Sequence, residues 1–431
     1  MNKDKISIFW FRRDLRLQHN IGLKAALSGD FPVLSLFIFD DDILDELPED
    51  DARVTFIYKK LSDLDRQLNK HHSGVLIKKG IVADVWESLI EDYNIQEVYF
   101  NHDYEPASIK RDQEIKKFLL SKNIKVDHFK DQVIFEKNEV LKNDDNPYTV
   151  YTPYKNKWLE TFKKSELPDD TITDKLLSNV YAFDNKFPAL KKLGFSKSSI
   201  AVKPINFYAL HNYGKYRDYP AKDGISYLSP HLRFGTVSIR EMVRKAEAEN
   251  EVFLSELVWR EFFMQILYHF PKVVTENFKS KYDGIKWRNN EKEFEKWCRG
   301  QTGYELVDAG MRQLNTTGYM HNRVRMITAG FLCKHLLIDW RWGEAYFAKK
   351  LLDYELSSNN GNWQWAAGTG CDAAPYFRIF NPHLQLKKYD EDLKYTQKYI
   401  QNYSANYLPR IVEHKFARAR ALESYKKGID N

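Results

Sequence analysis

The 431-residue sequence has few cysteines, few glycines and prolines, and no long apolar run. Its three cysteines, Cys298, Cys333 and Cys371, are far apart and form no CxxC pair, which argues against a disulfide framework and a metal site. Gly and Pro number only 19 and 14, which excludes collagen-like and low-complexity chains. No apolar run approaches the roughly 20 residues of a membrane helix, and the charged first residues lack the apolar core of a signal peptide. We therefore expect a packed cytoplasmic protein without a membrane segment.

The sequence also lacks the common catalytic motifs. It contains no HExxH, GxSxG, GxxxxGK[ST] or kinase signature, so hydrolysis and phosphoryl transfer have little support. The net charge of +6 is too small to indicate a nucleic-acid partner by itself. Its distribution is uneven, because residues 210–245 hold seven Lys or Arg against three acids, whereas residues 40–51 carry eight acids and no base. The second half is therefore the better candidate for binding a polyanion, and the acidic run is expected to be a solvated loop.

Five short β-rich runs alternate with amphipathic stretches in the first 130 residues. The runs are residues 6–11, 33–39, 74–79, 97–101 and 125–129, and helical apolar spacing occurs over 52–70 and 81–94. This alternation predicts a doubly wound, Rossmann-like α/β domain with a parallel sheet over residues 1–130. The turn after the first run has no GxGxxG, so this domain is not expected to be the main dinucleotide site.

The pattern changes after residue 130. Residues 131–200 are polar and irregular, which predicts an interdomain linker, although the aromatic-rich stretch 148–162 must pack against something. Residues 201–431 are predicted to form an all-α domain, because the runs 253–270, 303–314 and 322–340 have helical apolar spacing.

Tryptophan is concentrated in this second half, where seven of the ten lie between residues 259 and 365. Such a cluster suits core packing, base stacking or electron relay, and composition does not choose among them. Small residues surround Trp363 and Trp365 within residues 359–382, which indicates either a planar pocket or a tightly packed helix pair. Ser226 and Ser229 precede a predicted helix and suit phosphate oxygens or ordinary N-capping.

Several segments together resemble the photolyase and cryptochrome family, most closely the bacterial class I photolyases that act on cyclobutane pyrimidine dimers. They are WFRRDLRLQHN (10–20), SYLSPHLRFG (226–235), ELVWREFF (256–263), TGYMHNRVRM (317–326), LLIDWR (336–341), NNGNWQWAAGTGCDAAPYFRIFNP (359–382) and IVEHKFARARALESY (411–425). The resemblance implies an N-terminal α/β domain, a long connector and a helical domain that holds FAD. It also implies light-driven electron transfer from reduced FAD to a dimer in ultraviolet-damaged DNA, by a protein expected to be a monomer.

The resemblance assigns roles to individual residues, with Asn359, Glu256 and Asp353 as the expected catalytic group. The implied FAD contacts are Tyr213, Ile225, Ser226, Tyr227, Leu228, Ser229, Arg325, Asp353, Tyr354, Glu355 and Asn359. The implied lesion and DNA contacts are Arg217, Glu256, Trp259, Asn322, Arg323, Met326, Trp365 and Gln385. Trp363, Trp340 and Trp287 match a chain of three tryptophans that reduces oxidised flavin under light.

Two of these positions have more specific implications. Asn359 falls where the family faces flavin N5, and an amide there favours the fully reduced anionic flavin. Arg325 is expected to pair with Asp353 beside the flavin ring.

The sequence departs from the family pattern at three places. Glu355 stands where the bacterial pattern has Asp, and Ile225 replaces a hydroxyl residue of the phosphate loop. We expect FAD binding to survive the change to Glu355, and Ile225 removes one side-chain donor while its backbone amide remains. Ala107 and Ser108 replace the Asn and Glu of folate-binding relatives, so a methenyltetrahydrofolate antenna is not expected. A deazaflavin, a flavin or no antenna are the remaining alternatives.

Three rival interpretations were weighed. A cryptochrome-like blue-light receptor is disfavoured by Asn359 and by the intact lesion pocket. A photolyase for the (6-4) photoproduct resembles this chain but carries paired histidines where this sequence has His321 followed by Asn322. A nucleotide-binding module serving an unrelated ligase explains residues 1–130 but leaves the helical half without a role.

Overall fold

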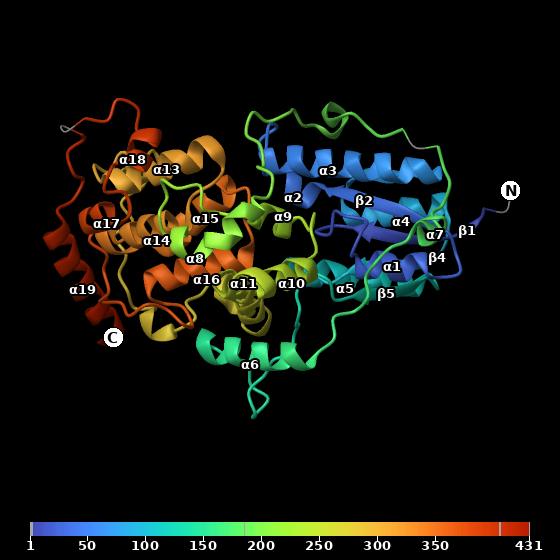
Figure 1. The fold of residues 1–431 in the computed structure, drawn as a ribbon, viewed down its shortest axis with the longest axis horizontal. Coiled ribbons are helices and arrows are strands. Elements are labelled where there is room, and N and C mark those ends of the chain that lie inside the picture. The colour runs from blue at the N-terminus through green and yellow to red at the C-terminus, as the bar shows by residue number, and fades with distance from the viewer. Residues whose placement is uncertain (1–2, 185, 405–406, 431) are drawn as a thin grey trace. The chain divides into compact units, whose positions relative to one another are not determined.

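A computed structural model of the chain describes residues 3–184, 186–404 and 407–430. The backbone packs into two compact units, each built from three separate stretches of sequence. The first unit comprises Met1–Glu136, Lys164–Pro204 and Leu228–Lys245, and the second comprises Lys137–Lys163, Ile205–Tyr227 and Ala246–Asn431. Figure 1 shows the order of the helices and strands along the chain.

The first unit contains a five-stranded parallel sheet in the order β3-β2-β1-β4-β5. The strands are β1 (Lys5–Phe11), β2 (Val33–Asp40), β3 (Val75–Gly80), β4 (Asn94–Asn101) and β5 (Lys125–Phe129). Its helices are α1 (Ile21–Leu27), α2 (Asp41–Leu44), α3 (Ala52–Leu68), α4 (Val82–Asp92), α5 (Pro106–Ser121), α7 (Asp174–Leu177) and α9 (Ser229–Arg233). The predicted doubly wound α/β domain is confirmed, and the strand order reverses at β1, as this fold requires.

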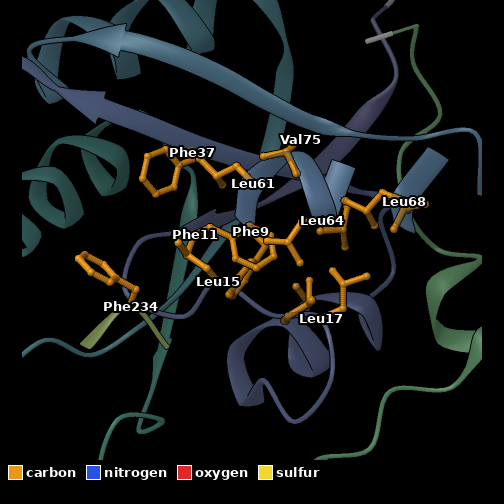
Figure 2. Close-up of a cluster of buried hydrophobic side chains, with 14 of the residues drawn as sticks. Phe9, Phe11, Leu15, Leu17, Phe37, Leu61, Leu64, Leu68, Val75 and Phe234 are labelled. Atoms are coloured by element: carbon orange, nitrogen blue, oxygen red, sulfur yellow. The ribbon is translucent and has the colours of Figure 1, made fainter. Parts of the chain in front are cut away.

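Both faces of the sheet are covered because alternate residues of each strand point to opposite sides. Phe9 and Phe11 of β1 join the cluster under α1 and α3, which Figure 2 shows. Ile8 and Trp10 of the same strand join a second cluster with α4 and α5. All four side chains are nearly inaccessible to solvent, so the strands read as continuous apolar runs in the sequence.

Two later stretches complete the first unit. The amide of Val33 donates to the carbonyl of Asn179 at 2.8 Å, so the residues around Asn179 pair with the first residue of β2. In α10 (Ile239–Glu249), the Arg240 guanidinium donates to Asp131 at 2.8 Å and to Asp170 at 2.5 Å.

The unit boundaries therefore differ from the expected division into 1–130, 131–200 and 201–431. Buried apolar and ionic side chains tie residues 164–204 and 228–245 into the first unit. These contacts join residues distant in sequence, and neither polarity nor periodicity reveals them.

The regular elements of the second unit are helices throughout its described residues, which confirms the predicted helical domain. They are α6 (Tyr151–Lys164), α8 (Tyr213–Tyr216), α11 (Glu251–His269), α12 (Glu291–Cys298), α13 (Glu305–Thr317), α14 (Asn322–Gly330), α15 (Trp340–Lys350), α16 (Leu356–Ala367), α17 (Pro382–Tyr389), α18 (Lys394–Tyr399) and α19 (His414–Asp430). No helix in the described part of the chain is long and apolar enough to cross a membrane.

The predicted helical run over 322–340 is interrupted. α14 ends at Gly330 and continues as a π-helical turn over Phe331–Leu336, and Leu337 then adopts a left-handed backbone with φ of 52°. Asp339 begins the next helix, α15, by accepting a hydrogen bond from the amide of Arg341. The intervening side chains are all buried, including Lys334 and His335, so hydrophobic spacing could not reveal the turn.

The small residues around α16 allow this helix to approach its neighbours closely. A Cβ atom at Gly343 of α15 would lie 2.1 Å from the ring of Trp363, and one at Gly361 would lie 2.2 Å from Phe263 of α11. The tightly packed helix pair considered for residues 359–382 is therefore present. One face of α16 packs in this way, which leaves the other face for the pocket described next.

Candidate active site

A pocket opens among α14, α15 and α16 of the second unit. Its lining brings together many of the residues predicted from the sequence: Asn322, Arg325, Met326, Asp353, Tyr354, Glu355, Asn359, Trp363 and Trp365. It also contains residues that the sequence reasoning missed: Ala329, Phe347, Leu351, Ser358 and Asn362. A pocket therefore lies beside the two tryptophans as well as the tight helix packing.

One polar edge of the pocket is an ion pair. The Nη2 atom of Arg325 donates to both carboxylate oxygens of Asp353, at 2.9 and 3.1 Å, and its Nε donates to the carbonyl of Met320 at 2.8 Å. The Asp353 side chain is only 6% exposed, so solvent screens the pair weakly. The expected contact between Arg325 and Asp353 is present, and it presents an arginine and a carboxylate to a ligand in the pocket.

Asn359 lies on α16 and is held from the neighbouring helix. Its Nδ2 atom donates to the Oε1 atom of Glu344 at 2.8 Å and to the main-chain oxygen of the same residue at 3.1 Å. Burial raises the pKa of Glu344, and the hydrogen bond from Asn359 opposes that rise. Glu344 was not predicted from the sequence, because no motif marks it.

The carboxylate of Glu355 faces α11. The Nε atom of Arg260 lies 3.3 Å from Glu355 Oε2, and both side chains are largely buried. A partly desolvated pair of this kind holds the last residue of the α15–α16 connection against α11. Arg260 stands inside the ELVWREFF segment, but its partner could not be identified without the fold.

The three tryptophans of the expected electron chain differ in exposure. Trp363 and Trp340 are 2% and 1% exposed in the helical core, whereas Trp287 is partly exposed beside it. The indole nitrogen of Trp340 donates to Asn277 Oδ1 at 2.9 Å, which fixes that ring. Trp297, a further buried tryptophan, lies 6.1 Å from Trp363 between ring centroids and was not assigned a role from the sequence.

Trp259, an expected lesion contact, is stacked by an aromatic ring from α6. The Tyr151 ring lies 3.5 Å from the Trp259 ring between centroids, with planes 9° apart, and its hydroxyl donates to the carbonyl of Ser255 at 2.7 Å. The aromatic-rich stretch expected to pack against something therefore packs against this tryptophan. Its richness in aromatics was the only sequence signal for Tyr151.

The arginines expected to contact DNA already have acidic partners. Arg217 forms an ion pair with Glu256, and Arg323 donates to Asp218 at 2.8 Å while lying over the ring of Tyr389. Tyr389 is in α17, the helix that also carries Gln385. None of these side chains lines the pocket, but Arg323 Nη1 lies 3.8 Å from the sulfur atom of Met326, which does.

The expected phosphate loop lies at the junction of the two units in the sequence. Tyr213, Ile225, Ser226 and Tyr227 belong to the second unit, and Leu228 and Ser229 belong to the first. None of these residues lines the pocket, so their contacts with FAD phosphates stay a prediction.

Local bonds shape the loop within the second unit. Tyr227 has a left-handed backbone with φ of 53°, and its hydroxyl donates to Asp223 at 2.7 Å. The carbonyl of Ser226 accepts from the amide of Asn206 at 2.8 Å.

His321 has a structural contact beside the expected lesion residue Asn322. Its Nδ1 accepts from the amide of Arg323 at the start of α14, and burial lowers its pKa to about 4. The imidazole is therefore neutral at neutral pH and caps the helix.

A flat, ring-shaped cofactor fits this pocket. Phe347, Leu351 and Trp363 supply apolar walls, whereas Asp353 and Asn359 supply polar groups, which suits the apolar faces and the hydrogen-bonding edge of a flavin. Among the described residues, no group of three or more His, Cys, Asp or Glu could hold a metal ion.

Comparison with known proteins identifies the family. The family model described as DNA photolyase matches residues 7–172, and the model described as the FAD binding domain of DNA photolyase matches residues 253–405. The deoxyribodipyrimidine photo-lyase of Halobacterium salinarum is 37% identical over 429 residues, which cover 92% of this chain and 89% of that protein.

Solved structures agree with this match. A bacterial class III photolyase from Agrobacterium tumefaciens superposes with a TM-score of 0.86 at 32% identity, covering 100% of this chain and 99% of the other. An archaeal photolyase from Sulfolobus tokodaii, whose structure contains two FAD molecules, superposes with a TM-score of 0.85 at 34% identity, covering 97% and 99%. The chain belongs to the DNA photolyase family.

Proposed function

We propose that this chain is a deoxyribodipyrimidine photo-lyase, which uses light and bound FAD to repair cyclobutane pyrimidine dimers in DNA. The observation that carries the proposal is the pocket, where Asn359, Asp353, Trp363 and Trp365 meet in a chain that matches photo-lyases over almost its full length. Hydrolytic and metal-dependent repair were given no support by the motifs of the sequence, and photolyase chemistry requires neither.

Reduced FAD, when bound, supplies on excitation the electron that splits the dimer and takes it back afterwards. The chain's own residues bind and orient the cofactor. Arg325 and Asp353 would hold the polar edge of the ring, and the buried walls of Phe347 and Trp363 would exclude water from its face. Asn359 supplies an amide, which accepts or donates a hydrogen bond without acting as an acid.

Apolar and polar side chains would contact different parts of the lesion. Trp259 and Trp365 present flat apolar surfaces to the cyclobutane edge, and Glu256 and Asn322 offer hydrogen bonds to the base edges. Met326 fills the remaining gap. Extrusion of the dimer from the helix costs less than extrusion of normal bases, because the lesion already weakens pairing and stacking.

The chain of tryptophans would restore the reduced state after oxidation. Trp363 lines the pocket, both Trp363 and Trp340 are buried, and Trp287 is partly exposed, so in this order only the last tryptophan is accessible to solvent. This order supports a path by which electrons from an external donor enter at Trp287.

Three finer assignments belong to the same proposal. We place the chain with the class I enzymes and expect it to act as a monomer.

We also propose that its antenna is not methenyltetrahydrofolate, since Ala107 and Ser108 begin α5 without the amide and acid of folate-binding relatives. The alternatives are a deazaflavin, a second flavin or none, and mass spectrometry of the chromophores released from purified protein separates them.

The proposal is tested with purified protein whose flavin has been reduced chemically. It is mixed with an oligothymidylate bearing cyclobutane dimers, and recovery of thymine absorbance is followed under blue light and in the dark. We expect recovery only in light, and a large loss of recovery in a Trp365→Ala variant that still binds FAD. Absence of recovery in the wild-type protein with bound, reduced flavin would reject the repair function and favour a photoreceptor.

A further inference from the structure

The turn after β1, residues 12–16, contacts a distant stretch of the first unit. In Rossmann-like domains this turn binds the diphosphate of a dinucleotide, and its glycines let the backbone approach the phosphates. Here the turn has no glycine and carries three arginines. It contacts residues 228–235, which we call the α9 segment. The segment begins with Leu228 and Ser229, two of the expected contacts of the FAD phosphates, so the turn holds a part of the chain that is itself expected to bind the diphosphate.

The backbone of the turn packs directly against the C-terminal end of the α9 segment. The amide of Leu15 donates to the carbonyl of Phe234 at 3.1 Å. The Nη1 atom of Arg16 donates to the carbonyl of Gly235 at 3.0 Å. Gly235 has φ of 61°, and a Cβ atom there would lie 2.0 Å from the carbonyl oxygen of Arg13. Because Phe234 also belongs to the apolar cluster of Figure 2, this end of the segment is fixed at several points.

Charged side chains add an ionic cluster at the same end of the segment. The Oε1 atom of Glu105 accepts from the guanidinium of Arg13 at 3.1 Å and from that of Arg233 at 2.8 Å. Arg13 also donates to Asp103 at 3.1 Å, and its Nε donates to the carbonyl of Arg233 at 3.3 Å. All four side chains are at most 18% exposed, so solvent screens their charges weakly. Glu105 therefore joins two like-charged arginines, one from the turn and one from the α9 segment.

Asp103 makes this anchor rigid. Burial acts to raise the pKa of Asp103, but Arg13, Arg12 and Arg233 outweigh it and hold that pKa below its usual range. The ionised carboxylate also accepts from the amide of Glu105 at 3.1 Å. Charge-assisted hydrogen bonds of this kind are shorter and stronger than neutral ones, so the cluster fixes the position of the Glu105 side chain.

We propose that Glu105 and Arg13 are positioning residues for the diphosphate of FAD. They hold the C-terminal end of the α9 segment, and the helix α9 carries that position to Leu228 and Ser229. The amide of Leu232 donates to the carbonyl of Leu228 at 3.0 Å, so the two ends of the segment move together. The inference rests on the proposed function, because it needs the phosphates of FAD at these residues.

The test compares variants of the full-length protein loaded with oxidised FAD. Glu105→Leu removes the carboxylate that joins the two arginines, whereas Glu105→Gln retains an oxygen that accepts from both. Glu97→Leu is the matched control, because Glu97 is also an ion-paired glutamate of the first unit, with a side chain 17% exposed against 18% for Glu105. Its partners include Tyr99 and Lys125, both of which lie outside the α9 segment.

The readouts follow the diphosphate and the flavin ring separately. Phosphorus NMR records the resonances of the bound diphosphate, and the visible absorption spectrum records the surroundings of the ring. The rate of FAD release in the dark is measured by the fluorescence of free FAD. The urea midpoint of each variant is measured alongside, so that a general loss of stability is recognised.

We expect Glu105→Leu to move the phosphorus resonances and to speed FAD release by about tenfold, while the ring spectrum stays that of the wild type. Glu105→Gln and Glu97→Leu should keep the wild-type resonances and release rate. Unchanged resonances and release in Glu105→Leu, or the same changes in Glu97→Leu, would overturn the positioning role alone. Failure of the wild-type protein to bind FAD would overturn the proposed function and this inference together.

A further variant keeps the inference testable if Glu105→Leu does not fold. Arg233→Gln removes the charged partner of Glu105 on the α9 segment and leaves the bonds from Arg13 to Asp103 and Glu105 in place. We expect its phosphorus resonances to differ from those of the wild type and its FAD release to be about threefold faster. Wild-type resonances and release in Arg233→Gln would overturn the inference.

Discussion

Histidines in the second unit are held neutral by burial, and this makes the fold sensitive to acid. The ring of His335 lies against Phe331 and bonds to His414 of α19 at 2.9 Å between Nε2 and Nδ1. Burial lowers the pKa of His335 to about 3, far below the value of about 6.5 in an unfolded chain. Below about pH 6.5 the His335 side chain is protonated in the unfolded state but stays neutral in the folded state. The free energy of unfolding therefore falls as the pH drops below about 6.5.

The first prediction concerns this histidine. Replacement of His335 by Gln should flatten the loss of stability between pH 7.5 and pH 5, because Gln does not titrate. The measurement is the urea midpoint at both pH values for the wild type and for His335→Gln. His383→Gln is the control, since His383 is exposed on α17. Identical pH dependence of His335→Gln and wild type would contradict the account.

Trp363 is the point where the pocket meets the expected electron chain. Replacement by Phe keeps an aromatic ring in the wall but removes the easily oxidised indole. We predict that light-driven reduction of oxidised flavin slows by at least about tenfold, which corresponds to roughly 1.4 kcal/mol of barrier. Repair by chemically reduced protein should persist. Flash absorption at the flavin bands measures the first rate, and unchanged photoreduction would exclude Trp363 from the path.

At the scale of elements, α6 packs against Trp259, an expected lesion contact. Its residue Tyr151 stacks on Trp259, while Tyr154, one turn later, contacts Phe262 and is equally buried. Tyr151→Leu and Tyr154→Leu each remove one buried aromatic ring of this helix, so both should lower stability. Only Tyr151→Leu should weaken binding of dimer-containing DNA, by roughly 3- to 10-fold for the loss of one stacked pair. Fluorescence anisotropy measures the affinities, and equal affinity in the two variants would refute the supporting role.

The close contact of α15 and α16 depends on Gly343. A methyl group there would overlap Trp363 at 2.1 Å, so Gly343→Ala should destabilise the protein by about 1–3 kcal/mol and lower its FAD content. Gly330→Ala is the matched control, because a Cβ at that position would meet Phe380 at 3.7 Å, an ordinary contact. It should gain up to about 1 kcal/mol from helix propensity. Urea unfolding measures the stability of both variants. A Gly343→Ala protein with wild-type stability and full FAD content would contradict the close packing.

The local hydrophobic pattern of the sequence predicted most of these helices and strands, but only some of the contacts between their side chains. The five strands and the helical runs over 253–270 and 303–314 were predicted in type from the sequence, whereas periodicity did not single out α16. The resemblance supplied most, but not all, of the residues that line the pocket. Glu344, Arg260 and Tyr151 were not predicted, because each acts through a partner distant in sequence and has no motif. The turn at residue 337 was hidden for a different reason, since its apolar neighbours Leu336 and Ile338 continue the hydrophobic run.

At the scale of the whole molecule, the affinity for DNA should have two separable contributions. One comes from contacts with phosphates and does not depend on the lesion, and the other comes from contacts with the lesion. Arg217 would contact phosphate, so Arg217→Ala should weaken damaged and undamaged DNA alike and reduce the salt slope by about 1 or less. The smaller value applies because Glu256 already neutralises part of its charge. Trp259→Ala should weaken only damaged DNA and leave the slope unchanged. Affinities measured across a series of salt concentrations test this separation, and a slope change in Trp259→Ala would contradict it.

The central claim is that the pocket of the second unit serves repair of cyclobutane dimers and not another light-dependent function. The most direct measurement offers one oligonucleotide with a single cyclobutane thymine dimer and another with a single (6-4) photoproduct to the same chemically reduced protein under blue light. Chromatography then quantifies the restored strands. The account predicts restoration of the cyclobutane substrate in light and none in the dark, with the (6-4) substrate unchanged. Restoration of the (6-4) substrate, or of neither one while reduced flavin stays bound, would contradict it.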